Sequence, residues 1–168
     1  MPYVLTPQPL TRASFAPFGD VIETQGCTPL AINDGFAERF HDLARLEVAA
    51  EGGRALVSIF RGQPRPSPLR LAVMERHPLA SQAFFPLHDR DWLVVVAAGP
   101  DPVAGRALRA FRAGGRQGVQ YGRNVWHHPL LVLVPDHEFL VVDRDGPGDN
   151  LEEVSFATPA VLVTDQQV

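Results

Sequence analysis

The chain has 168 residues, 45% of them hydrophobic and 20% charged, and its formal net charge is −4. This acidic balance, without a basic stripe, argues against nucleic-acid binding, and no apolar run is long enough to cross a bilayer. The fifteen Lys and Arg residues are all arginine. The chain therefore cannot use a Schiff-base lysine, as pyridoxal-phosphate enzymes do, or a Walker-type phosphate lysine.

The length predicts one domain over residues 1–168. A chain of this size buries roughly 70% of its unfolded surface, so it needs no disulfide or structural metal to hold a core. The single Cys27 provides no internal disulfide and indicates a reducing compartment. The first residues have no signal-peptide pattern, so we expect a cytoplasmic protein.

The elements expected along the chain are mostly short strands. Thr11 is expected to cap a short helix over residues 12–15 that Pro17 ends, and residues 43–51 allow a second, weak helix. The β-type runs that follow are residues 55–60, 69–74, 92–96, 130–134, 139–142 and 160–163. Short strands separated by Gly, Pro and Asp turns predict an all-β fold, which we interpret as a jelly-roll barrel with one or two short helices.

A first group of polar side chains lies in residues 75–87, directly after one of these strands. Strand alternation puts Glu75 and His77 on one face and Arg76 on the other, with Gln82 near the start of the next strand. An imidazole exchanges protons near neutral pH, and this property suits a histidine at position 77 to proton transfer or metal ligation. The alternative interpretation is a half-exposed turn with an ordinary structural histidine.

A second, denser group lies in residues 118–130. It contains Tyr121, Arg123, Asn124, Trp126, His127 and His128. Polar and aromatic side chains at this density are typical of a binding pocket. His127 and His128 point to opposite faces of a strand, so at most one enters the barrel, while the other caps an edge or supports the first. A bulged edge strand with an incidental histidine pair is the alternative.

Smaller features are consistent with turns and strand ends. Residues 32–35 predict a tight turn, and residues 38–42 predict a solvated strand with alternating charge. Arg61 follows an apolar strand, where its planar guanidinium suits a carboxylate. Asp143 and Arg144 end another strand, where an ion pair at the rim is expected.

Two histidine-bearing segments about fifty positions apart resemble the double motif of the cupins. In that superfamily the first motif gives two His and a Glu and the second gives one His, all around a metal. This chain has one His in the first segment, and Gln82 stands where a carboxylate is usual.

In its individual motifs the chain resembles the ureidoglycolate lyase family over nearly its full length. The matching pieces are residues 18–24, Ile32-Asn33 with Gly35, Arg39 with His41-Asp42, Arg61 with Gln63-Pro64, residues 75–79 and 82–84, residues 123–130, and Asp143-Arg144. The chain departs from the family at Gly122, Ala80 and Phe40, where histidine, glycine and tyrosine respectively are usual.

The resemblance implies a cupin-like barrel, usually dimeric, that converts (S)-ureidoglycolate to glyoxylate and urea in allantoin degradation. We expect His77, His127 and Gln82 to be catalytic. The expected substrate-binding residues are Asn33, Arg61, Tyr121, Arg123, Asn124 and His128. One divalent metal (Ni, Mn or Zn) is expected on His77, Gln82 and His127, with Glu75 as a further ligand candidate, and no organic cofactor.

Three alternatives stay open. An amidohydrolase would release ammonia and carbon dioxide instead of urea, and a non-catalytic cupin-type sensor would bind a small acid to regulate a partner. The third alternative concerns the mechanism, in which protons are transferred either by two histidines or by a histidine beside a metal-bound hydroxyl. We further expect a homodimer, in which the tail strand over residues 160–163 contacts the neighbouring subunit or covers a sheet edge.

Overall fold

The structure, a computed structural model, describes residues 2–163 and consists mainly of strands. A larger curled sheet runs in the order β1-β15-β7-β12-β9-β10-β2, with β13 paired to β9. Its strands are β1 (Val4–Leu5), β2 (Gln8–Pro9), β7 (Leu69–Arg76), β9 (Trp92–Ala97), β10 (Leu108–Ala113), β12 (Trp126–His127), β13 (Leu131–Val132) and β15 (Glu152–Leu162). The N-terminal segment joins the two ends of this sheet, because β1 pairs with β15 and β2 pairs with β10.

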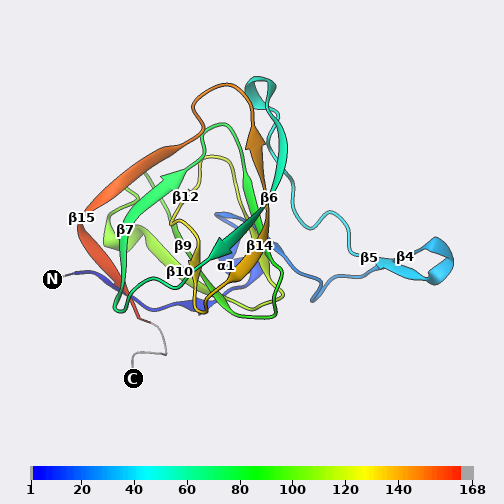
Figure 1. Cartoon of the computed structure of the whole chain (residues 1–168), viewed down its shortest axis with the longest axis horizontal. Coiled ribbons are helices and arrows are strands. Elements are labelled where there is room, and N and C mark those ends of the chain that lie inside the picture. Colours follow the sequence, from blue (N-terminus) through cyan, green and yellow to red (C-terminus); the bar gives the residue numbers. More distant parts are fainter. Residues whose placement is uncertain (1, 164–168) are drawn as a thin grey trace.

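The second sheet runs in the order β3-β11-β8-β14-β6. Its strands are β3 (Gly19–Ile22), β6 (Arg54–Gly62), β8 (Gln82–Pro86), β11 (Gly118–Tyr121) and β14 (His137–Asp145). Apolar side chains fill the space within the barrel; fully buried examples are Trp92, Phe139 and Leu71. Figure 1 shows the strands curling around this interior. The predicted all-β, cupin-like fold is confirmed.

The predicted N-terminal helix is present as α1 (Arg12–Phe15). The Thr11 side chain accepts a hydrogen bond from the Ser14 N–H, and the Ser14 hydroxyl accepts one from the Thr11 N–H. This reciprocal capping box stabilises so short a helix. Phe15, at the end of α1, is fully buried in the core.

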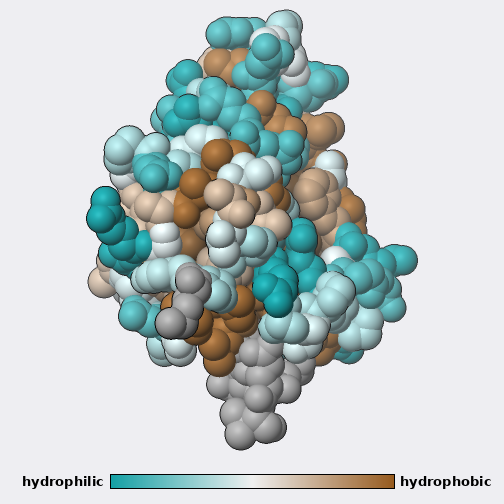
Figure 2. Space-filling view, turned by 90° about the vertical axis from the view of Figure 1, so that its left-hand side faces the viewer, coloured by the Kyte–Doolittle hydropathy of each residue, from teal (hydrophilic) through white to brown (hydrophobic). Residues whose placement is uncertain are grey.

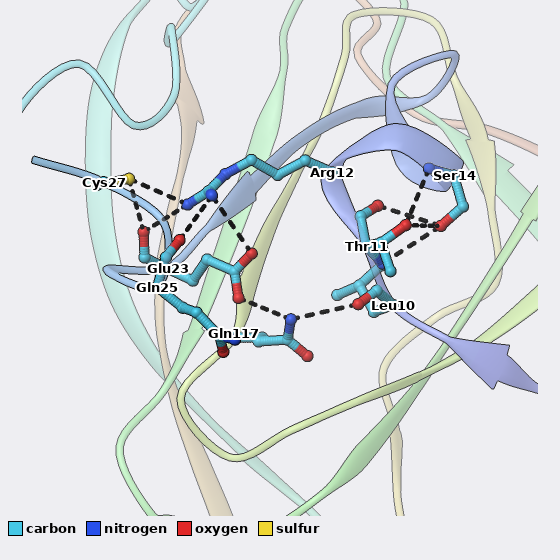
Figure 3. Close-up of polar contacts among 8 residues, drawn as sticks. All are labelled: Leu10, Thr11, Arg12, Ser14, Glu23, Gln25, Cys27 and Gln117. Atoms are coloured by element: carbon cyan, nitrogen blue, oxygen red, sulfur yellow. Dashed lines mark hydrogen bonds and ion pairs between the residues drawn. The ribbon is translucent and has the colours of Figure 1, made fainter.

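Arg12 also stabilises the turn that follows β3 (Figure 3). Its guanidinium donates to the carbonyl oxygens of Glu23 at 2.8 Å and Gln25 at 2.7 Å, and it lies 3.2 Å from the Sγ of Cys27. The Gln117 amide donates to the carboxylate of Glu23 at 2.8 Å. These contacts hold residues 23–27, which connect β3 to the next element, in place.

That next element is a two-stranded ribbon, formed by β4 (Leu30–Ile32), the 3₁₀ turn η1 (Asn33–Gly35) and β5 (Ala37–Arg39). We call residues 30–39 the arm. Its tip has positive φ at Asn33, Asp34 and Gly35, which confirms the predicted tight turn. Figure 1 shows the arm projecting from the body on extended chain, on the side where β6 and β14 lie.

Two local expectations differ from the structure. Residues 43–51 form no α-helix; only the 3₁₀ turn η2 (Ala50–Gly52) occurs there, with a positive φ of 51° at Glu51. A third 3₁₀ turn, η3 (Gly105–Ala107), precedes β10. In the described chain, Asp143 and Arg144 do not pair with each other. Arg144 instead donates to the main-chain carbonyls of residues 50, 146 and 147.

The tail strand lies within its own chain. β15 pairs with β7 on one side and β1 on the other, and its register shifts between Ser155 and Ala160, where Pro159 has no N–H to donate. Ala160 and Leu162 are buried, so residues 160–162 cover an edge of the chain's own sheet. Figure 2 shows this side of the molecule, where hydrophobic patches alternate with hydrophilic ones. No helix in the described residues has the length and apolarity to cross a membrane.

Candidate active site

The two histidine-bearing segments meet inside the barrel. β12 pairs with β7 so that His127 lies opposite Glu75, and the ring centroids of His77 and His127 are 5.3 Å apart. The Asn124 N–H donates to the carbonyl of His77 at 3.0 Å, which ties the two segments together just beside these rings. Residues fifty positions apart in the sequence thereby share one site.

Each imidazole has one nitrogen held by the main chain. His77 Nδ1 lies 2.7 Å from the carbonyl oxygen of Asn150, and His127 Nδ1 lies 2.9 Å from that of Val125. A carbonyl only accepts, so both Nδ1 atoms carry the proton and both Nε2 atoms face the site. His127 Nε2 is buried and without a hydrogen-bond partner among the described residues.

Glu75 completes a group of three potential metal ligands with His77 and His127. One ligand atom from each side chain lies within 4.8 Å of the other two. Burial alone would raise the pKa of Glu75, but the imidazole of His127, followed by those of His77 and His128, lowers it below its usual value. A carboxylate held ionised beside two imidazoles is a donor set that a divalent transition metal prefers.

Tyr121 and Gln82 surround this group. The Tyr121 ring stacks on His127 at a centroid distance of 4.1 Å and an angle of 6°. Its burial, together with the charge of Glu75, raises the pKa of the phenol, so Tyr121 remains protonated. Gln82 Oε1 lies 3.2 Å from His77 Nε2, and the Gln82 amide also interacts with Asp143.

A cavity of about 530 Å³ opens beside these side chains. Its walls are Phe60, Arg61, Gly62, Arg65, Glu75, Gln82, Phe84, Pro129 and Leu130. Glu75 and Gln82 therefore connect the two histidines to a space that also contains two arginines. Such a space, in which apolar walls alternate with polar groups that include two arginines, suits a small anion.

The two cavity arginines differ in their partners. Arg61 donates from Nε and Nη2 to Glu138, at 2.9 and 2.6 Å, and this pairing lowers the pKa of Glu138. Arg65 has no side-chain partner among the described residues, and its positive charge contributes to lowering the pKa of His128. One edge of Arg61 and the whole head group of Arg65 remain available to a ligand.

Comparison with known proteins assigns the chain to a family. The family model described as ureidoglycolate lyase matches residues 2–163. The chain belongs to the ureidoglycolate lyase family. It is 56% identical to ureidoglycolate lyase 1 of Rhizobium meliloti (strain 1021), over 96% of this chain and 95% of the relative. It is also 55% identical to ureidoglycolate lyase of Burkholderia mallei (strain NCTC 10229) over 96% and 94%, and 53% identical to that of Rhizobium etli (strain CIAT 652) over 96% and 97%.

The other expected site residues lie in different parts of the structure. His128 is buried, its Nδ1 lies 2.7 Å from the Pro129 carbonyl, and burial lowers its pKa to about 4, so it is neutral near pH 7. Arg123 is exposed and donates from Nε to the carbonyl of Pro78. Asn124, also exposed, lines a separate hollow with Arg76 and Trp126. Asn33 lies at the tip of the arm.

Three residues at the site were not among the expected site residues. Arg65 lies in a proline-rich stretch, which has no periodic pattern from which a strand or helix could be predicted. Asp143 was expected to form an ion pair with Arg144 at the rim. It instead interacts with Gln82 and His77, and burial raises its pKa. Asn150 holds His77 through its main-chain carbonyl and also accepts the Leu79 N–H on its side chain. A main-chain contact of this kind leaves no mark in a single sequence.

Proposed function

We propose that this protein cleaves the C–N bond of (S)-ureidoglycolate to give glyoxylate and urea. The observation that carries the proposal is the meeting of Glu75, His77 and His127 beside a cavity that contains arginine. Membership of the ureidoglycolate lyase family supports the substrate. The reaction belongs to allantoin breakdown and nitrogen use, and the single unpaired thiol of Cys27 supports a cytoplasmic location.

The reaction needs one proton removed and one supplied. The substrate carbon bears a hydroxyl, a ureido nitrogen and a carboxylate. As the hydroxyl loses its proton, the C–O bond becomes the carbonyl of glyoxylate, and the electron pair of the breaking C–N bond moves to nitrogen. That nitrogen takes up a proton and leaves as urea, so no redox cofactor or covalent nucleophile is required.

His127 and His77 are the residues to which we assign these proton transfers. His127 Nε2 lies 3.5 Å from the Glu75 carboxylate, which stabilises the imidazolium once the hydroxyl proton has been accepted. His77 faces Gln82 through Nε2, at 3.2 Å, and we assign it as the donor of the proton to the leaving nitrogen. Tyr121, stacked on His127, keeps that ring in place.

The arginines of the cavity bind the substrate carboxylate in this proposal. Arg61 offers the guanidinium edge that Glu138 does not occupy. Arg65 lines the same cavity and adds a second positive charge. A planar guanidinium can contact both carboxylate oxygens, and the Gln82 amide matches the urea end of the substrate. Arg123 and Asn124 support the site by joining its two segments.

The same donor set fits one divalent ion, Ni²⁺, Mn²⁺ or Zn²⁺, held by Glu75, His77 and His127, with Gln82 adjacent. The buried Nε2 of His127, which makes no hydrogen bond among the described residues and lies 3.5 Å from the Glu75 carboxylate, supports this fit. Bound there, the ion would lower the pKa of the substrate hydroxyl. Ligation would occupy the same Nε2 atoms that exchange protons in the scheme above, so the ion and the two-histidine scheme are alternatives. If the ion is required, treatment with a chelator abolishes turnover and one of these ions restores it. If turnover survives complete metal removal, measured by mass spectrometry, the histidines act without an ion.

Product analysis tests the proposal. Purified protein is incubated with (S)-ureidoglycolate, and glyoxylate, urea and ammonia are quantified over time. We expect glyoxylate and urea to accumulate in equal amounts. Ammonia in place of urea would mean the amidohydrolase reaction, and tight binding without any product would mean a sensor.

A further inference from the structure

Asp143 lies on the inner face of β14, across from Gln82. β14 pairs antiparallel with β8, with Val141 opposite Phe84, and two positions further along the same register brings Asp143 opposite Gln82. Val141 and Phe84 are buried in the core, and residues two positions away on a strand point to the same face. Asp143 therefore faces the interior of the barrel, and none of the steps assigned above uses it.

The Asp143 carboxylate has few partners for a charged group in this position. Burial raises its pKa, whereas the interaction with the Gln82 amide, followed by the charge of His77, opposes this effect by favouring the ionised form. Its Oδ1 is buried and makes no hydrogen bond among the described residues. An ionised carboxylate only accepts hydrogen bonds, so the part of the Gln82 amide that interacts with it is the NH₂ group.

This contact decides which end of the Gln82 amide faces the active site. With its NH₂ group directed at Asp143, Gln82 presents Oε1 to the site, where it lies 3.2 Å from Nε2 of His77. An amide oxygen has two acceptor positions, so one remains for a ligand in the cavity that Gln82 lines. The two ends of an amide have nearly the same shape, so without the carboxylate either end fits toward the cavity.

The polar groups of the cavity are thereby separated by type. Arg61 and Arg65 offer only N–H donors, whereas Glu75 and the Oε1 of Gln82 offer acceptors. A ligand with a carboxylate at one end and N–H groups at the other pairs with both kinds of group in one orientation only. A ligand with apolar groups in place of the N–H groups leaves the acceptors unpaired, which costs binding free energy.

We propose that Asp143 is a positioning residue that makes the site selective for acids with a ureido group, by holding the Gln82 amide with its oxygen toward the N–H groups of the substrate. The walls of the cavity include Gln82 and not Asp143, so Asp143 acts through Gln82. The inference rests on the proposed function, which supplies the ureido acid, and extends it to the residue that selects the ureido group.

Two acids that lack the reacting hydroxyl separate binding from turnover. Hydantoate is the N-carbamoyl derivative of glycine, and levulinate has the same shape with CH₂ and CH₃ in place of NH and NH₂. By calorimetry, the wild type should bind hydantoate about tenfold or more tightly than levulinate, because a site that pairs with N–H groups rejects the analogue without them. In Asp143→Leu, which has no acceptor, this preference should fall to within about threefold, chiefly through weaker binding of hydantoate.

Two further variants test whether Asp143 acts through Gln82. Gln82→Met removes the amide and should lose the preference for hydantoate as Asp143→Leu does, and adding Asp143→Leu to Gln82→Met should cause no further loss. Asp143→Asn, which is close to the native side chain in shape and keeps one oxygen acceptor, should retain part of the preference. The matched control is Asp145→Leu, the same change further along β14, where the carboxylate pairs with Arg54 away from the cavity; its preference should equal that of the wild type.

The affinity ratio of the two acids decides the outcome, and urea unfolding checks that each variant is folded. An equal ratio in the wild type and Asp143→Leu would overturn the inference, as would a further loss when the Asp143 change is added to Gln82→Met. A wild type that converts ureidoglycolate to glyoxylate and urea but binds both acids equally would overturn this inference alone. A wild type that forms neither product would overturn the proposed function on which the inference rests.

Discussion

His77 and His127 owe their orientation to main-chain groups. The carbonyls of Asn150 and Val125 hold the Nδ1 atoms, so each Nε2 is directed at a side chain of the site, Gln82 or Glu75. This arrangement fixes the tautomer of both rings before any substrate binds. Preorganisation of this kind limits the reorganisation that the reaction requires.

Arg61→Lys is expected to raise the Michaelis constant for ureidoglycolate by about 5- to 150-fold, which corresponds to a loss of about 1–3 kcal/mol. An ammonium keeps the charge but cannot bind Glu138 and a carboxylate through two edges. Steady-state kinetics measure the change. The matched control is Arg54→Lys at the opposite end of β6, where the arginine also pairs with a carboxylate, that of Asp145, through Nη2 and away from the cavity. Equal constants in wild type and Arg61→Lys would mean that the carboxylate is bound elsewhere.

Strands and turns with strong local signals could be predicted from the sequence. The Thr11 cap follows from a side chain that bonds the nearby backbone, and the turn at residues 33–35 follows from residue types that tolerate positive φ. The exposure of β6 could not be predicted, because an apolar run of this length is also what a buried strand shows. Which side of such a strand is covered depends on tertiary pairing, here with β14 alone in the described sheet.

β15 stabilises the barrel by closing its larger sheet. Leu162→Ala should lower the free energy of unfolding by about 2–5 kcal/mol, because Leu162 is fully buried between β1 and β7 and its loss leaves a cavity. Val163→Ala, the neighbouring control, should have little effect, since Val163 is 38% exposed. Urea unfolding measures both. Equal stabilities of the two variants would contradict the packing of the tail described above.

Across the whole molecule, the two site segments were identified from the density of their polar side chains, and their meeting follows from the pairing of β7 with β12. The partners that complete the site come from further away. Arg65 lies in a loop and Asp143 on β14, and no local pattern connects either to His77. Asn33 is brought away from the cavity of its own chain by the arm, a placement that only the three-dimensional fold reveals.

The stability of the folded protein should fall as the pH decreases below about 6.5. His137 is completely buried, and burial, with the charge of His88, lowers its pKa. The unfolded chain then binds a proton near its usual pKa that the folded chain does not bind, so acid favours unfolding. His137→Leu should show a smaller difference in unfolding free energy between about pH 7 and pH 5 than the wild type. An identical pH dependence in both proteins would exclude His137 as a source of this effect.

The claim that His77 and His127 form the reacting centre is tested most directly by the turnover number for (S)-ureidoglycolate. We compare the wild type with His77→Asn, His127→Asn and the control His88→Asn, whose histidine lies near Glu138 and not near Glu75. Both site variants should remain folded and lose a factor of about 100 or more in kcat, as removal of a general acid or base does. The control should stay close to the wild type. If His77→Asn and His127→Asn both retain more than about half of the wild-type kcat, the reaction does not take place at this cluster.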